Sequence, residues 1–247
     1  MCNRSMKWMC RSMVEQTSKI ICVGNLKGGV GKSTLCVYLF DYLRKKLTKR
    51  NVVLVDTDPQ GTSYELMETT ANPGSLKHLS IGDRYDGVSM STLDGILRRN
   101  VSQSGYLTFV DTGAGKLGNF SQMMMLCNTL LVPTSMSWAD LRPTLDFIKN
   151  IDERKDEMDS IIPHVIVVPN RVSPRQKDFS TLTESLDGLN VIMAPPVSDL
   201  SAARSDLSKF HGIDGVKGTR FFGEIERLGQ FIIDYVISGE LDRIYSK

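Results

Sequence analysis

Short apolar runs recur along the chain, and polar or helix-patterned stretches separate them. The runs cover residues 19–23, 52–55, 107–111, 129–133, 164–168 and 191–197. Their length and the turn residues around them predict buried strands, whereas residues 35–47 and 138–151 carry apolar side chains at helical spacing. Strands that alternate with helices build a parallel sheet covered on both faces. The pattern therefore predicts an α/β fold, with a mostly parallel twisted sheet and helices on both faces.

Two stretches follow this pattern less closely. Residues 62–105 are rich in Gly, Ser and Asp with weak periodicity, and only residues 93–97 predict a short helix there. Residues 221–244 carry an apolar stripe at helical spacing, and a helix lying on a membrane would need a polar face rich in Lys and Arg. We therefore expect the stripe to pack on the core and not on a membrane, because acids dominate that face: Glu224, Glu226, Asp234, Glu240 and Asp242.

The first 18 residues precede the first predicted strand and contain no apolar stretch typical of a signal peptide. We expect residues 1–18 to be a disordered N-terminal extension, although a functional basic arm stays open as an alternative. Residues 19–247 are long enough to bury the core of a single domain, with 41% hydrophobic residues in the chain of 247.

Charge and cysteine content bear on the binding partners and the cellular compartment of the protein. The net charge of +2 is too small to indicate nucleic acid by itself, although the first 50 residues carry eleven Lys and Arg against two acids. Of the five cysteines, Cys22 and Cys36 fall in core-like segments, which is typical of buried thiols in a reducing cytoplasm. No apolar run approaches the length that spans a bilayer.

Residues 24–34 read GNLKGGVGKST and stand between the first strand and a predicted helix. Gly24, Gly31, Lys32 and Ser33 fill the frame of a phosphate-binding loop. Its glycines let the backbone wrap closely around a polyphosphate, and the N–H groups that open the helix point at it. Lys32 would supply charge to the outer phosphates, and the Ser33 hydroxyl would ligate Mg²⁺.

Acidic residues end two further strands. Asp56 and Asp58 follow the second run, and Asp111 ends the third. Carboxylates beside a phosphate loop can hold Mg²⁺ or orient the attacking water. The three together favour a catalytic site over isolated turn residues.

The motifs together resemble the ParA/MinD family of ATPases. The second lysine in the loop, Lys27, is similar to the extra lysine of the family's deviant Walker A loop, which reaches the partner's phosphates in a nucleotide-sandwich dimer. The segment DTDPQG at 56–61 resembles the family's second-strand motif. The resemblance implies that Asp58 acts in hydrolysis, with Lys27 and Lys32, and that Ser33, Asp56 and Asp111 serve the metal. It also implies a set of phosphate contacts: Lys27, Gly28, Gly29, Val30, Gly31, Lys32, Ser33 and Thr34.

Later segments extend the resemblance over roughly residues 19–238. Asn170 and Arg171 follow the strand at 164–168 and resemble the family's adenine-contacting segment, and Pro195 lies in a similar proline-bearing loop. An ordinary turn role for Asn170 stays open. The chain departs from the family after Asp111, where residues 113–115 read GAG in place of prolines, and this change concerns the switch that senses the γ-phosphate.

The resemblance implies a cytoplasmic, Mg²⁺-dependent ATPase that dimerises with ATP and partitions plasmid DNA or another cargo. The ATP dimer would bind DNA non-specifically on the nucleoid, and a centromere-binding, ParB-like protein would stimulate hydrolysis. Three alternatives stay open: a MinD-like membrane-positioning ATPase, a small-molecule kinase or synthetase, and a nucleotide-dependent scaffold with little turnover.

Overall fold

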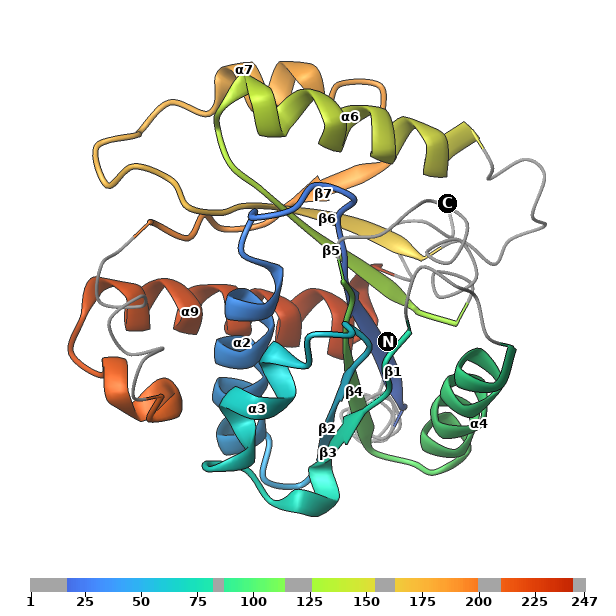
Figure 1. Cartoon of the computed structure of the whole chain (residues 1–247). Helices are drawn as coiled ribbons and strands as arrows, with labels where there is room; N and C mark the ends of the chain where they lie inside the picture. Colours follow the sequence, from blue (N-terminus) through green and yellow to red (C-terminus); the bar gives the residue numbers. More distant parts are fainter. Residues whose placement is uncertain (1–16, 82–86, 114–125, 154–162, 200–209, 242–247) are drawn as a thin grey trace, which may run out of the picture.

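The structure is a computed structural model that describes residues 17–81, 87–113, 126–153, 163–199 and 210–241. Seven strands form one parallel sheet in the order β3-β2-β4-β1-β5-β6-β7 (Figure 1). Every predicted strand is present, and β3 is an addition. The strands are β1 (Lys19–Val23), β2 (Asn51–Asp56), β3 (Leu76–His78), β4 (Tyr106–Asp111), β5 (Thr129–Thr134), β6 (His164–Pro169) and β7 (Val191–Met193).

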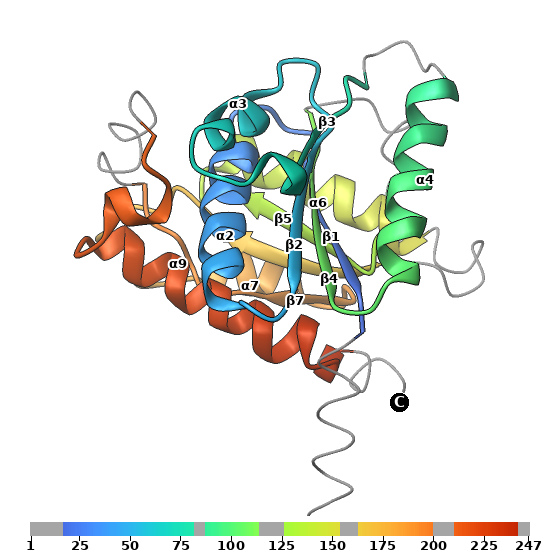
Figure 2. The ribbon, with the colours of Figure 1, turned by 90° about the horizontal axis from the view of Figure 1, so that it is seen from below.

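Helices cover both faces of the sheet, as Figure 2 shows. One face carries α2 (Lys32–Lys46), α3 (Thr62–Glu68) and α9 (Arg220–Phe231), with the short turns η1 (Pro73–Ser75), η3 (Gly212–Val216) and the π-helical η4 (Ile232–Ile237). The other face carries α4 (Gly87–Ser102), α6 (Trp138–Glu153) and α7 (Ser180–Ser185). The predicted α/β fold is confirmed.

The alternation of side chains along β1 divides the core in two. Ile21 and Val23 pack toward α2, whereas Ile20 and Cys22 pack toward α4 and α6. Both faces of the central strand are therefore apolar, which explains its continuous hydrophobic run. The predicted burial of Cys22 and Cys36 is confirmed, since both side chains are fully enclosed.

The stretch at 62–105 contains more structure than the sequence predicts. The expected short helix at 93–97 is wrong in extent, because these residues lie inside the sixteen-residue α4. Met90, Leu93 and Leu97 are buried on one side of α4, but interspersed Gly and Ser dilute the pattern. The short β3 pairs only with β2, so it is an edge strand with no apolar run to announce it.

The apolar stripe near the C-terminus packs on the core, as predicted. Ile225, Leu228 and Ile232 are fully buried in the cluster that contains α2. The expectation that Glu224 belongs to the exposed acidic face is wrong: it is 2% exposed. Its carboxylate accepts hydrogen bonds from the backbone N–H and hydroxyl of Ser198, both at 2.7 Å, so it anchors the loop after β7.

Two other expectations concern residues that the structure does not describe. Residues 1–16 of the expected extension, and Asp242, lie outside the described ranges. Within the described part of the chain, no helix combines the length and apolarity needed to cross a bilayer.

The contact between α9 and α2 allows us to predict how two glycine substitutions change the stability of the fold. A Cβ on Gly229 would lie 2.5 Å from two ring carbons of Tyr42, whereas one on Gly223 of the same helix would meet only Arg227 Nη1, at 3.7 Å. Gly229→Ala should lower the free energy of unfolding by about 1–3 kcal/mol through overpacking. Gly223→Ala should raise it by up to about 1 kcal/mol through helix propensity. Urea unfolding of both variants checks this, and equal effects would contradict the close packing.

Candidate nucleotide-binding site

The loop between β1 and α2 has the shape that anion binding requires. Gly29 and Gly31 adopt positive φ angles of 78° and 86°. Gly31 is the N-cap of α2 and provides no side-chain cap, so the N–H groups of the first turn remain directed at the space in front of the helix. Gly31 also allows close approach, because a Cβ there would lie 2.6 Å from the Asn170 amide nitrogen. The N-terminus of α2 is therefore suited to bind an anion.

A buried amide, Asn25, holds the start of the loop. Its Nδ2 donates to the Pro133 carbonyl at 2.9 Å and to the Thr144 hydroxyl at 2.8 Å, and its Oδ1 accepts from the N–H of Lys27 at 3.0 Å. These bonds tie the loop to β5 and α6. The sequence analysis did not single out Asn25, because its partners on β5 and α6, Pro133 and Thr144, lie more than a hundred residues away.

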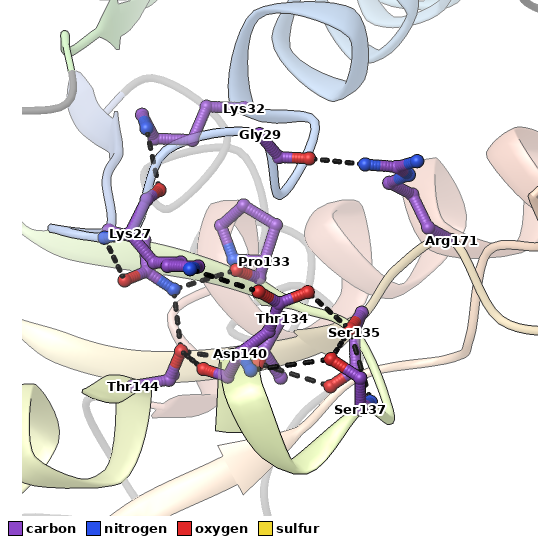
Figure 3. A network of polar contacts seen from close by, with 11 residues as sticks. Lys27, Gly29, Lys32, Pro133, Thr134, Ser135, Ser137, Asp140, Thr144 and Arg171 are labelled. Carbon is purple, nitrogen blue, oxygen red and sulfur yellow. Dashed lines mark hydrogen bonds and ion pairs between the residues drawn. The ribbon is translucent and has the colours of Figure 1, made fainter. Parts of the chain in front are cut away.

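Two residues after β6 hold the other side of the loop. Asn170 Nδ2 donates to the Val30 carbonyl at 2.8 Å. Arg171 Nη1 donates to the Gly29 carbonyl at 2.5 Å (Figure 3). Arg171 has a φ of 55°, the one positive value for a non-glycine residue in the described ranges. Such a backbone costs about 1–3 kcal/mol and persists where surrounding contacts impose it. The adenine role of Asn170, Arg171 and the half-buried Pro195 stays a prediction.

Lys32 lies inside the loop with 7% of its surface exposed. Its ammonium donates to the Lys27 carbonyl at 3.2 Å (Figure 3). Burial lowers the pKa of Lys32, while the carboxylates of Asp111 and Asp58 oppose that shift. The structure thus brings together three residues that the sequence predicted for one site.

Lys27 lies on the outside of the loop, with 39% of its side chain exposed. Its ammonium is 3.6 Å from Asp140 Oδ1 at the start of α6 (Figure 3). The Ser135 hydroxyl donates to the other oxygen of Asp140 at 2.7 Å. This hydrogen bond chiefly, with smaller contributions from Ser137 and Lys27, holds the pKa of Asp140 below its usual range. A carboxylate of the same chain therefore retains Lys27, a contact that the sequence did not predict.

The two acids after β2 have different tasks. Asp56 is fully buried, and its two oxygens accept from the N–H groups of Asp58 and Tyr64, both at 2.9 Å. Asp58 is half-buried, and its Oδ1 accepts from the N–H of Gln60 at 2.9 Å. A Cβ on Gly113 would lie 3.1 Å from Asp58 Oδ2. Gly113, where the family pattern has proline, therefore leaves space beside Asp58, while Ala114 and Gly115 lie outside the described residues.

Asp111 carries the strongest mark of a cation site. Both of its oxygens are buried, and neither has a hydrogen bond of normal geometry within the described chain. Burial and the neighbouring Asp56 raise its pKa from 3.8 to about 7, and the nearby hydroxyls of Ser33 and Ser63 oppose this less strongly. Within the described residues the buried Ser63 hydroxyl also makes no hydrogen bond of normal geometry, and the sequence analysis missed this residue.

These residues fit Mg²⁺. Uncompensated carboxylate oxygens beside a hydroxyl are hard oxygen ligands. The described ranges hold no group of three or more His, Cys, Asp or Glu side chains arranged for a metal. A magnesium ion here would therefore be held by Ser33 and Asp111, with phosphates and water completing its shell, whereas the oxygens of Asp56 already accept backbone hydrogen bonds.

Comparison with known proteins agrees with this geometry. The family model of the CobQ/CobB/MinD/ParA nucleotide binding domain matches residues 21–208. The chromosome-partitioning ATPase Soj of Thermus thermophilus is 40% identical over 76 residues, which cover 31% of this chain and 29% of Soj. The matched segments thus span only about a quarter of the length of the curated relatives.

Solved structures share the fold over most of the chain. McdA from Cyanothece, in complex with ATP, has a TM-score of 0.65 at 14% identity and covers 89% of this chain and 96% of its own. MinD from Pyrococcus horikoshii, in complex with Mg-ADP, has a TM-score of 0.62 at 13% identity, with 89% and 98% covered. At these identities the likeness establishes the fold.

The pKa of Asp111 makes a prediction about pH. Because the folded state binds this proton more tightly than the unfolded chain, the ionised carboxylate destabilises the fold, and the destabilisation disappears as the pH falls from about 7 toward 4. Asp111→Asn, measured without Mg²⁺ or nucleotide, should gain stability over the parent as pH rises, by at most about 1.4 kcal/mol per unit. The gain should level off above about pH 7.

Urea unfolding across this pH range measures the difference between variant and parent. The exposed Asp146 on α6 provides the control, since Asp146→Asn removes a carboxylate that is not buried. A stability difference for Asp111→Asn that is independent of pH would contradict the assignment of a buried, uncompensated carboxyl.

Proposed function

The chain belongs to the CobQ/CobB/MinD/ParA family of nucleotide-binding domains, and on this premise we propose that it is a Mg²⁺-dependent ATPase of the ParA type. It would dimerise with ATP and partition plasmid DNA or another cargo. One observation carries the proposal: buried Lys32, at the uncapped start of α2, interacts electrostatically with the carboxylates of Asp111, which ends β4, and Asp58, which follows β2.

In the proposed nucleotide site, a few groups have separate roles in binding the phosphates and positioning the attacking water. The N–H groups of residues 28–34 and the ammonium of Lys32 would bind the phosphates of ATP. Mg²⁺, when bound, would neutralise phosphate charge. Asp58 would position the attacking water through Oδ2, the oxygen that faces Gly113. Such a site works chiefly by positioning and electrostatics.

The adenine base would lie near the end of β6. Asn170 donates one amide hydrogen to the Val30 carbonyl, and within the described residues its other amide hydrogen and its oxygen make no hydrogen bond. An amide that can donate and accept at once matches the edge of adenine. Arg171 and Pro195 would border the base.

The dimer would form across the face that bears Lys27. Trp138 opens α6 on this side, two residues before Asp140, and is 64% exposed. Exposed aromatic side chains are enriched at protein interfaces. In the dimer, each Lys27 would exchange Asp140 for the phosphates bound by the partner.

DNA would bind non-specifically to basic surface residues of the ATP dimer on the nucleoid. A ParB-like, centromere-binding partner would stimulate hydrolysis and release. The similarity to a chromosome-partitioning ATPase supports this cargo. A MinD-like membrane role has less support, because the apolar stripe of α9 is engaged on the core.

Asp58→Ala should separate binding from turnover. The variant should bind ATP like the parent but hydrolyse it at least tenfold more slowly, because Asp58 would position water and not phosphate. Lys32→Ala is the comparison, and it should lose about 1.5–3 kcal/mol of ATP binding with its charge-assisted hydrogen bond. Calorimetry and phosphate release measure the two effects. Parental turnover in Asp58→Ala would move the hydrolytic role elsewhere.

Lys27→Gln should keep nucleotide binding by the single chain but weaken ATP-dependent dimerisation. Asp140→Asn is its matched variant: it removes the partner that retains Lys27, so its ATP dimer should form at a protein concentration equal to or below that of the parent. Light scattering with ATP, ADP and no nucleotide measures this. If both substitutions weaken the dimer equally, the face is structural and Lys27 does not cross it.

DNA co-sedimentation under the same nucleotide conditions tests the cargo. Binding should require ATP, fall with Lys27→Gln, and weaken steeply with added salt as phosphate contacts release counterions. A chain that dimerises with ATP but ignores DNA at low salt would exclude the DNA-partitioning role while leaving the ATPase intact.

A further inference from the structure

An open cavity lies away from the phosphate loop. Its volume is about 470 Å³, and it is lined from the end of α2, from β2, from η1 and β3, from α4 and from the start of β4. Asn51 and Tyr106, the first residues of β2 and β4, border it, whereas Asp56 and Asp111 end those strands. Figure 2 shows β3 and β2 in the sheet and α4 on one face of it. Six-residue strands place these ends about 17 Å apart, so the cavity is separate from the nucleotide site.

The lining is strongly basic. Arg44, Arg50, Lys77 and Arg99 contribute cations, and no Asp or Glu is among the lining residues. Arg44 is already paired with Asp41 at 2.6 Å. In contrast, the exposed side chains of Lys77 and Arg99 have no hydrogen bond or ion pair with any part of the chain that the structure describes. Among the described residues, no carboxylate pairs with these two cations, so the cavity carries positive charge that this part of the chain leaves uncompensated.

The positions of Lys77 and of Arg99 can each be explained by local effects, but these effects do not explain why both residues line one cavity. Lysine on an edge strand such as β3 discourages pairing with other chains. Arginine in the last turn of α4 complements the helix dipole. Neither effect requires that the two cations line one cavity, and an anion bound there would be attracted by both.

The other lining groups indicate the size and chemistry of that anion. Amide side chains of Asn51, Asn72 and Gln103 provide donors and acceptors, and the half-buried Tyr106 and Ile96 provide apolar surface. The volume lies in the range of small-molecule pockets. Duplex DNA is too wide to enter a cavity of this size. Small phosphates can be surrounded by its cations.

We propose that this cavity is a second anion site that binds a phosphorylated small molecule of about nucleotide size. Lys77 and Arg99 bind the phosphate, and the amides and Tyr106 contact the rest of the ligand. The site is independent of the ATPase proposal, because it shares no lining residue with the phosphate loop.

Calorimetry tests the site with pyrophosphate and AMP as probes. The Lys32→Ala substitution weakens phosphate binding at the loop, and the full chain that carries it should still bind one saturable equivalent of probe. Adding Lys77→Gln or Arg99→Gln should weaken binding about tenfold or more for each cation removed. Arg98→Gln is the matched control: Arg98 neighbours Arg99 on α4 but pairs with Asp94 and does not line the cavity. It should leave the affinity unchanged.

Three results would overturn the proposal. The first is no saturable binding of either probe to the Lys32→Ala chain. The second is an affinity that Lys77→Gln and Arg99→Gln do not change, or that Arg98→Gln lowers equally. The third is retention of a short DNA duplex that depends on Lys77 and Arg99 while neither small probe binds, which would assign these cations to a nucleic-acid surface. Thermal unfolding of each variant confirms that the substituted chains are folded.

Discussion

The site depends on two carboxylates that are buried side by side at the carboxyl ends of two neighbouring strands. Asp56 and Asp111 are direct partners in the register of β2 and β4, and β1 pairs Val23 with the same Asp111. Parallel pairing thus brings two negative charges next to the loop that follows β1. Asp56 is stabilised by backbone N–H groups, whereas Asp111 is not. This difference leaves one buried carboxyl that a cation can stabilise, and the ammonium of Lys32 lowers its pKa.

The loop itself is held from two sides. Asn25 binds it to β5 and α6, and Asn170 and Arg171 bind it to the end of β6. These contacts preorganise the backbone N–H groups, so phosphate binding would need little rearrangement there. Lys27 differs, because its ammonium sits on a half-exposed ion pair with Asp140. Exposed pairs of this kind contribute little stability, so Lys27 can change partners at low cost. A rigid cradle beside an exchangeable lysine is what a dimerisation switch requires.

The two ends of the sheet carry different chemistry. Loops at the carboxyl ends of β1, β2 and β4 gather the nucleotide-site residues, as parallel sheets generally do. The amino ends of β2 and β4 border a cavity with positive charge and no acid. Both arise from parallel pairing, which collects residues distant in the sequence at the same edge.

Much of the fold and of the site could be predicted from the sequence, because the signals are local. Apolar runs mark β1, β2, β4, β5, β6 and β7, and the spacing of Gly31, Lys32 and Ser33 after a strand is sufficient to predict a phosphate loop. The strand-end positions of Asp56 and Asp111 predict that they meet. The prediction from apolar periodicity failed where Gly and Ser interrupt the pattern, as in α4. It also failed where a strand was too short to form an apolar run, as in β3.

The sequence by itself therefore predicted six of the seven strands, a phosphate-binding loop and the acids beside it, but not β3, α3 or α7. Only the tertiary structure decided which of these acids keeps free oxygens, that Glu224 is buried against Ser198, that Asn25 and Asp140 hold the loop and its outer lysine, and that Lys77 and Arg99 share a cavity. The physical reason is that burial and hydrogen bonding depend on partners far away in the chain, and no local pattern records where the fold will bring them together.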